Sequence, residues 1–184
     1  MQSAVTAEVV EPYAEALMSL AQEKNLTDEI GNNIRSMQTM FAESPELSTF
    51  LASPLIKAED KKAVIKKIAG DDTNSFFINF LMLLVDRKRI SFVEGIFRKY
   101  LEILRKINNV VLAEVTSAVK LYEGEAEKLV QKIKNLTGAN DVEIQTIIDP
   151  DIIGGVIIKV GSQVYDASLK GQLRRISFGM LGSV

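Results

Sequence analysis

Apolar residues recur at helical spacing through roughly the first hundred positions of the chain. The first such stripe consists of Tyr13, Ala16, Leu17 and Leu20, which share one face of a helix. Pro12 lies just before this stripe, and a helix tolerates it if it falls in the first turn. The chain therefore opens with a predicted amphipathic helix.

Three shorter helical patterns follow, and capping or helix-breaking residues mark their ends. Thr27 and Ser44 are the expected caps of the second and third helices, and Ser53 and Gly70 are the expected stops of the third and fourth. Their apolar positions are Ile30, Ile34, Met37, Phe41, Leu47, Phe50, Leu51, Val64, Ile65 and Ile68. Each helix thus has one apolar face to bury.

The fifth pattern is apolar almost all round. It starts near Thr73 or Asn74 and contains Phe76, Phe77, Ile78, Phe80, Leu81, Met82, Leu83 and Leu84. Such a helix is either central to a bundle or has one face awaiting a partner. A sixth helix is expected to start at the capping box Ser91-x-x-Glu94. Six helices joined by short loops predict a compact bundle over residues 1–106.

After Asn108-Asn109 the pattern changes to alternation. Residues 110–119, 142–148 and 156–160 are rich in β-branched side chains at strand spacing, and 123–137 returns to helical spacing. Gly161-Ser162 is expected to form a tight turn, and Ser168 to cap a last helix. Residues 107–184 are therefore a predicted small α+β domain with a mixed or antiparallel sheet, and the whole chain belongs to the α+β class.

The amino-acid composition excludes most kinds of catalytic site. The 184 residues include no cysteine, no histidine and no tryptophan. Thiolate sites, imidazole bases and nearly all zinc sites are thereby excluded. The phosphate-binding pattern G-x-x-x-x-G-K-[ST] is missing too. We expect no enzyme, no cofactor and no metal site.

Charge is nearly balanced overall but uneven along the chain. The net charge is −2, whereas nucleic-acid binders usually carry a basic excess. Residues 1–46 hold two basic and eight acidic residues, and residues 57–106 hold twelve basic and seven acidic ones. This pattern is typical either of solvated helix faces or of a polarised binding surface.

No membrane-spanning stretch is predicted. The longest apolar run, Phe80 to Val85, is far shorter than the roughly 20 residues that a spanning helix needs. The N-terminus also lacks the basic and apolar regions of a secretory signal. The sequence thus favours a cytosol-like location.

A long pattern in the second half of the chain resembles a known family signature. It comprises Asp149, Gly154, Gly155, Lys159 and Gly161, followed by Asp166, Ser168 and Gly171. These residues resemble the signature of the ATP synthase delta subunit family, whose mitochondrial counterpart is the oligomycin-sensitivity-conferring protein. Two further segments support the likeness. Pro12-Tyr13-Ala14-x-Ala16-Leu17 is similar to the family's first helix, whereas Asp86-Arg87-Lys88-Arg89-Ile90 departs from its usual Asn-Gly-Arg-Leu-like loop.

The resemblance covers the whole chain and implies a role. The amino-acid sequence of residues 9–14 is similar to that of family members from the cyanobacterial and plastid branch. Family members are non-catalytic stator subunits, one copy per complex, which link the catalytic head of the F-type ATP synthase to its peripheral stalk. This implies partners in the N-terminal segments of the alpha subunits, in the b-type stalk subunits and in the beta subunit. It also implies a peripheral position on the cytoplasmic or stromal side of a plasma or thylakoid membrane, without direct insertion.

In the family, one alpha segment lies as a helix in a groove between the first and fifth helices. The resemblance therefore implies groove residues Tyr13, Ala16, Leu17, Leu20, Phe80, Leu83 and Leu84. The C-terminal domain would meet the far end of the stalk. Composition alone leaves an alternative open, namely an adaptor that binds nucleic acid or protein through its α+β domain.

Overall fold

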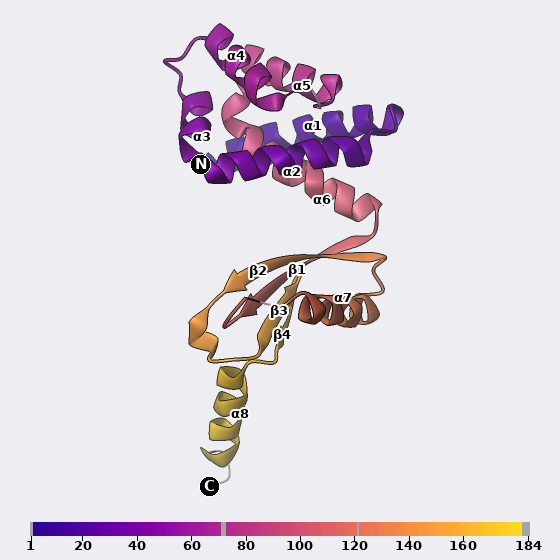
Figure 1. The fold of residues 1–184 in the computed structure, drawn as a ribbon, viewed down its shortest axis with the longest axis vertical. Coiled ribbons are helices and arrows are strands. Elements are labelled where there is room, and N and C mark those ends of the chain that lie inside the picture. Colours follow the sequence, from indigo (N-terminus) through magenta and orange to yellow (C-terminus); the bar gives the residue numbers. More distant parts are fainter. Residues whose placement is uncertain (1, 71–72, 121, 182–184) are drawn as a thin grey trace. The chain divides into compact units, whose positions relative to one another are not determined.

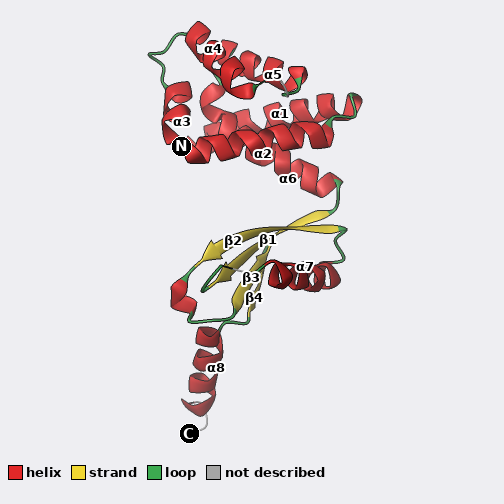
Figure 2. Cartoon of the chain, viewed as in Figure 1, coloured by secondary structure: helices red, strands yellow, loops and turns green. Residues whose placement is uncertain are grey.

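The computed structural model describes residues 2–70, 73–120 and 122–181. The chain divides into two compact units, Met1–Leu104 and Arg105–Val184. The first is helical, and the second combines helices with a four-stranded sheet (Figure 2). The predicted α+β class is confirmed.

The first unit contains helices packed around a single apolar core (Figure 1). The elements are α1 (Gln2–Glu23), α2 (Thr27–Glu43), α3 (Pro45–Ala52), α4 (Ala58–Ala69), α5 (Ser75–Asp86), the 3-10 helix η1 (Ile90–Phe92) and α6 (Val93–Ile107), whose last turn belongs to the second unit. The rings of Phe77 and Phe97 lie 5.6 Å apart in this core. The hydroxyl of the buried Tyr100 donates a hydrogen bond to the Thr27 carbonyl (3.0 Å), which ties α6 to the start of α2.

Three expected helix starts differ from the observed ones. Helix α1 begins at Gln2, so Pro12 lies inside it and removes the N–H that would bond the Glu8 carbonyl. Thr27 is the first residue of α2 and not its cap. The Ser91-x-x-Glu94 capping box does not form, because Ser91 lies in η1 and the Glu94 carboxylate accepts a hydrogen bond from the Ser48 hydroxyl (2.5 Å). In these three places, tertiary contacts and the surrounding helix determine where each helix begins, and the local capping residues do not.

The second unit is built on a mixed sheet with strand order β2-β1-β3-β4. The elements are β1 (Val110–Ser117), α7 (Glu123–Thr137), β2 (Asp141–Ile148), the 3-10 helix η2 (Pro150–Ile152), β3 (Val156–Val160), β4 (Gln163–Asp166) and α8 (Leu169–Leu181). Strands β1 and β2 are parallel because α7 carries the chain back between them, and the other two pairings are antiparallel. Of the two sheet types expected, the mixed one is present.

The core of the second unit is small. It consists of Ala113, Val115, Ile133, Val142 and Ile158, which come from α7 and three strands. Figure 1 shows α7 along the sheet, whereas α8 extends beyond the end of β4. Much apolar surface on and around α8 therefore stays exposed.

Candidate partner-binding groove

An open apolar groove of about 370 Å³ lies between α1 and α5. Its lining residues are Pro12, Tyr13, Ala16, Leu17, Leu20, Phe80 and Leu83. The α1 residues share a face because they follow the spacing i, i+3, i+4 and i+7. The rings of Tyr13 and Phe80 meet edge to face across the two helices, with centroids 6.4 Å apart and planes at 63°. Six of the seven residues implied by the resemblance thus converge on one surface.

Leu84 does not reach this groove. Its side chain is fully buried in the core of the first unit, because it lies about 100° around α5 from Leu83. Pro12 occupies the groove in addition to the expected residues. It precedes Ala16 by four residues, and this helical spacing is the sequence signal for its place in the groove.

The groove combines a buried floor with accessible edges. Leu17 is buried, Tyr13 and Leu20 are half-buried, and Ala16 is exposed. Leu83 keeps 44% of its surface exposed, whereas Leu81 and Leu84 on the same helix are buried. The small Ala16 side chain lets a partner backbone approach closely. The surface therefore has the shape and polarity of a site for one apolar helix face.

Three acidic side chains of α1 lie outside the groove lining. Glu8, Glu11 and Glu15 are all exposed. Lys99 on α6 forms an ion pair with Glu11 (2.9 Å), and this hydrogen bond raises the pKa of Lys99.

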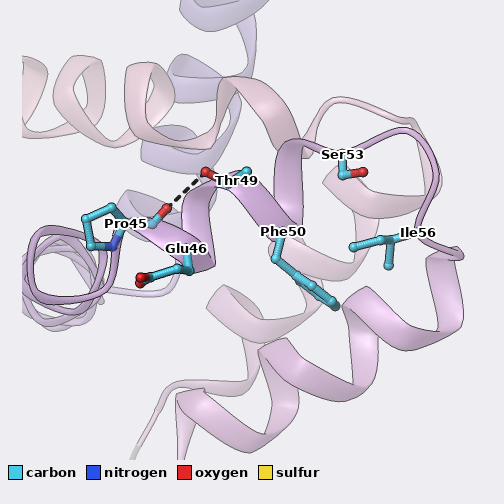
Figure 3. A pocket seen from close by; sticks show the side chains of 6 residues that line it. All are labelled: Pro45, Glu46, Thr49, Phe50, Ser53 and Ile56. Atoms are coloured by element: carbon cyan, nitrogen blue, oxygen red, sulfur yellow. Dashed lines mark hydrogen bonds between the residues drawn. The ribbon is translucent and has the colours of Figure 1, made fainter.

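A second hollow, of about 480 Å³, lies at α3 and the loop that follows it (Figure 3). It is lined by Pro45, Glu46, Thr49, Phe50, Ser53 and Ile56. The Thr49 hydroxyl donates to the Pro45 carbonyl (3.2 Å), so its polar atom is satisfied within α3. The sequence pattern placed Phe50 on a face to be buried and did not predict this hollow. The apolar residues Leu55 and Ile56, which follow Pro54 in the loop, were the available signal.

Most signature residues of the second unit meet where α8 begins. The Asp166 Oδ1 atom accepts hydrogen bonds from the Ser168 backbone N–H (2.9 Å) and hydroxyl (2.6 Å). The buried Ser168 Oγ in turn accepts from the Gly171 N–H (3.0 Å), so Ser168 caps α8 as its pattern predicted. These bonds to Ser168 lower the pKa of Asp166.

Two signature glycines bring the chain close to this cap. The Gly154 carbonyl accepts a hydrogen bond from the Leu169 N–H (2.9 Å). Gly155 has φ +77°, and a Cβ there would overlap the Ala167 carbonyl oxygen. The two glycines thus form a bend that connects the start of α8 to the entry of β3.

The remaining signature residues lie elsewhere in the same unit. Lys159 pairs with Glu114 across β3 and β1 (3.0 Å), and Gly161 occupies the β3–β4 turn with φ +58°. The Asp149 carboxylate accepts from the Asp151 N–H (3.0 Å) and begins η2. These contacts shape the fold, and none of them forms a reactive group.

Across the part of the chain that the structure describes, no three histidine, cysteine or acidic residues are grouped to hold a metal ion. Within the same residues, no helix has both the length and the apolar character that crossing a membrane requires.

Comparison with known proteins decides the family. The family model "ATP synthase delta (OSCP) subunit" matches residues 9–180. The chain belongs to the ATP synthase delta (OSCP) subunit family. It is 54% identical to ATP synthase subunit delta of Crocosphaera subtropica, over 98% of each chain. It is 55% identical to the same subunit of Thermosynechococcus vestitus, over 96% of each chain.

A solved structure shows the same fold. The match is to a chain of the Toxoplasma gondii mitochondrial ATP synthase hexamer, with a TM-score of 0.75 and 19% identity, covering 96% of this chain and 99% of that one. The resemblance noted in the sequence, including its cyanobacterial character, is confirmed. As a delta (OSCP) family member the chain is a non-catalytic stator subunit of the F-type ATP synthase.

Proposed function

We propose that the α1–α5 groove binds the N-terminal segment of an alpha subunit as an amphipathic helix. In this proposal, α1–α6 form one six-helix bundle over residues 1–106 that holds the catalytic head. Residues 107–184 hold the far end of the b-type peripheral stalk. One copy per complex would then keep the head from turning with the rotor, so that rotor torque drives ATP synthesis.

The observation that carries this proposal is the convergence of six expected residues on one groove. Residues 13–20 and 80–83 are far apart in the sequence, yet both line the same opening. The groove is apolar, elongated along two helices and partly open, as expected for a site that receives a helix. Leu83 and Tyr13 offer apolar surface that the folded chain itself leaves uncovered.

A stator contact must also dissociate slowly under load. A nanomolar dissociation constant corresponds to about −12 kcal/mol. Burial of one leucine-sized side chain contributes about 1.5–3 kcal/mol, so several anchors must be covered together. Tyr13, Leu20 and Leu83 provide such a set within one groove, and the buried Phe80 forms part of its floor.

The proposed location follows from these partners. The subunit would lie on the cytoplasmic or stromal side of a plasma or thylakoid membrane and touch the membrane only through the complex. The beta subunit is a further proposed contact on the head.

Copurification tests the function. Full-length tagged chain is mixed with isolated head from a cyanobacterium, either intact or with the alpha N-terminal segments removed. We expect the intact head to be retained and the truncated head to be lost. Equal retention of both heads would contradict the groove as the site of attachment.

A further inference from the structure

The α5 wall of the groove continues one turn past Leu83 and ends on a cation. Phe76, Phe80, Leu83 and Arg87 follow the spacing i, i+4, i+7 and i+11, so they lie within an arc of roughly 60° on one face of the helix. The Arg87 N–H donates to the Leu83 carbonyl (2.9 Å), so Arg87 keeps the helical path although it caps α5. Arg87 therefore lies on the groove face, about 6 Å farther along the helix axis than Leu83.

The two ends of this wall differ in character. Phe76 is 38% exposed and extends the apolar surface toward the start of α5. Arg87, at the other end, is exposed and cationic. An occupant that complements the whole wall must therefore present apolar residues along most of its contact face and an acidic residue at one end.

The charge of Arg87 is not neutralised by its neighbours. The adjacent Asp86 pairs with Lys62 of α4 (2.5 Å), and helical geometry places Asp86 about 100° around α5 from Arg87. Among the described residues, no carboxylate forms an ion pair with Arg87. Lys88 and Arg89 follow it in the chain, and both are exposed. This end of α5 thus concentrates positive charge that a partner carboxylate can use.

We propose that Arg87 is a specificity-determining residue of the groove and pairs with an aspartate or glutamate of the bound helix. The inference rests on the proposed function, in which the occupant is the N-terminal segment of an alpha subunit, and it adds a charge requirement to that contact. The carboxylate lies one helical turn beyond the apolar side chain that packs on Leu83. Charged pairs fix the register of an interface and exclude wrong partners, which uniform apolar contacts do weakly.

The exposure of Arg87 determines how large its effect is. An exposed ion pair contributes little to affinity by itself. Reversal of the charge costs more, because it places like charges against each other at the interface. Neutralising and charge-reversing substitutions should therefore differ in their effects, whereas they should not differ if Arg87 only covers apolar surface with its stem.

Calorimetric titration of the alpha N-terminal peptide of the same organism into the full-length chain tests the proposal. Arg87→Gln should weaken binding about threefold, as expected for the loss of an exposed ion pair. Arg87→Glu should weaken binding about tenfold, because it sets a carboxylate against the peptide carboxylate. The affinity of wild type should also fall with added salt more steeply than that of Arg87→Gln.

The matched control is Arg98→Glu on α6. Arg98 is exposed, and the adjacent Lys99 pairs with Glu11. Glu11 lies about 140° around α1 from Ala16, on the side of that helix away from the groove. Arg98→Glu changes the net charge as much as Arg87→Glu does, and it should bind as wild type. Circular dichroism checks that both variants keep the helix content and unfolding temperature of wild type.

Charge exchange identifies the partner carboxylate. Each aspartate and glutamate of the peptide is replaced in turn by lysine, and every peptide is titrated into wild type and Arg87→Glu. One of these peptides should bind Arg87→Glu more tightly than it binds wild type. A folding defect would give no recovery, and an effect of overall charge would give the same recovery for every peptide.

The possible failures are distinct. If wild type does not bind the peptide, the proposed function of the groove is wrong. If wild type binds and Arg87→Glu loses no more affinity than Arg98→Glu, the groove stands and the role of Arg87 is wrong. The role is equally wrong if no single lysine peptide restores binding to Arg87→Glu. If Arg87→Glu weakens binding of the intact head but not of the peptide, the cation meets another surface of the head and the proposal is overturned.

Discussion

The Tyr13 ring packs edge to face on the Phe80 ring, with centroids 6.4 Å apart, and so joins α1 to α5 at the groove. Aromatic pairs of this geometry contribute about 0.5–1.5 kcal/mol beyond the area they bury. Tyr13 is only half-buried, so one side of its ring remains available to a partner. The contact therefore shapes the groove and supplies part of its binding surface.

The ring of Tyr13, and not its hydroxyl, should matter for binding. Tyr13→Ala removes the ring and should weaken binding of an alpha N-terminal peptide about tenfold, or about 1.4 kcal/mol. Tyr13→Phe keeps the ring and should bind as wild type. Calorimetric titration measures both variants, and an equal loss for Tyr13→Phe and Tyr13→Ala would show that the hydroxyl carries the contact.

Gly171→Ala should destabilise the second unit. A Cβ at this position would overlap the Asp166 carboxylate, which two bonds to Ser168 hold in place. Displacing it disrupts the cap of α8, at a cost of about 0.5–2 kcal/mol. Gly124→Ala in α7 is the matched control, since a Cβ there meets nothing within 4 Å. This control should be neutral or stabilising by up to about 1 kcal/mol. Denaturant unfolding compares the two, and equal effects would contradict the steric account.

The Asp166 carboxylate should titrate below its ordinary pKa of 3.8, chiefly because it accepts hydrogen bonds from Ser168. A lowered pKa in the folded state means that ionised Asp166 stabilises the fold above pH 3.8. That stabilisation disappears as the pH falls through the folded-state pKa. Asp166→Asn should therefore be less stable than wild type near pH 7, and the gap should close in acid.

Nuclear magnetic resonance of the carboxyl carbon measures the Asp166 pKa directly. Ser168→Ala removes the hydroxyl bond and should return the pKa toward its ordinary value. An unchanged pKa in this variant would assign the shift to the backbone bond or to the nearby arginines.

Elements with strong local signals could be predicted from the sequence. Asn74 caps α5 through its side chain, which accepts from the Phe76 N–H (2.9 Å), and Gly138 ends α7 in the left-handed region. The alternation in residues 110–119 likewise predicted β1, which spans Val110–Ser117 and buries Ala113 and Val115. These residues interact with backbone groups only a few positions away in the sequence. A short segment of sequence is therefore enough to predict the features that they form.

Features that depend on distant residues could not be predicted. Glu94 accepts from Ser48, 46 positions away, instead of closing a capping box. The strand predicted over residues 110–119 ends at Ser117, so Val119 lies beyond it and is exposed. Leu83 and Leu84 are adjacent and equally apolar, yet the packing of α5 alone decides that one lines the groove and the other lies in the core. The parallel pairing of β1 with β2 also depends on how α7 returns the chain.

Calorimetric titration of an alpha N-terminal peptide into the Leu83→Glu variant tests the central claim most directly. Leu83 lines the groove and is 44% exposed, so a charge there should leave the fold intact and abolish measurable binding. Leu55→Glu, at a leucine that is 93% exposed outside the groove, is the control and should bind as wild type. Unchanged affinity of the Leu83→Glu variant would contradict the assignment of the groove as the alpha-binding site.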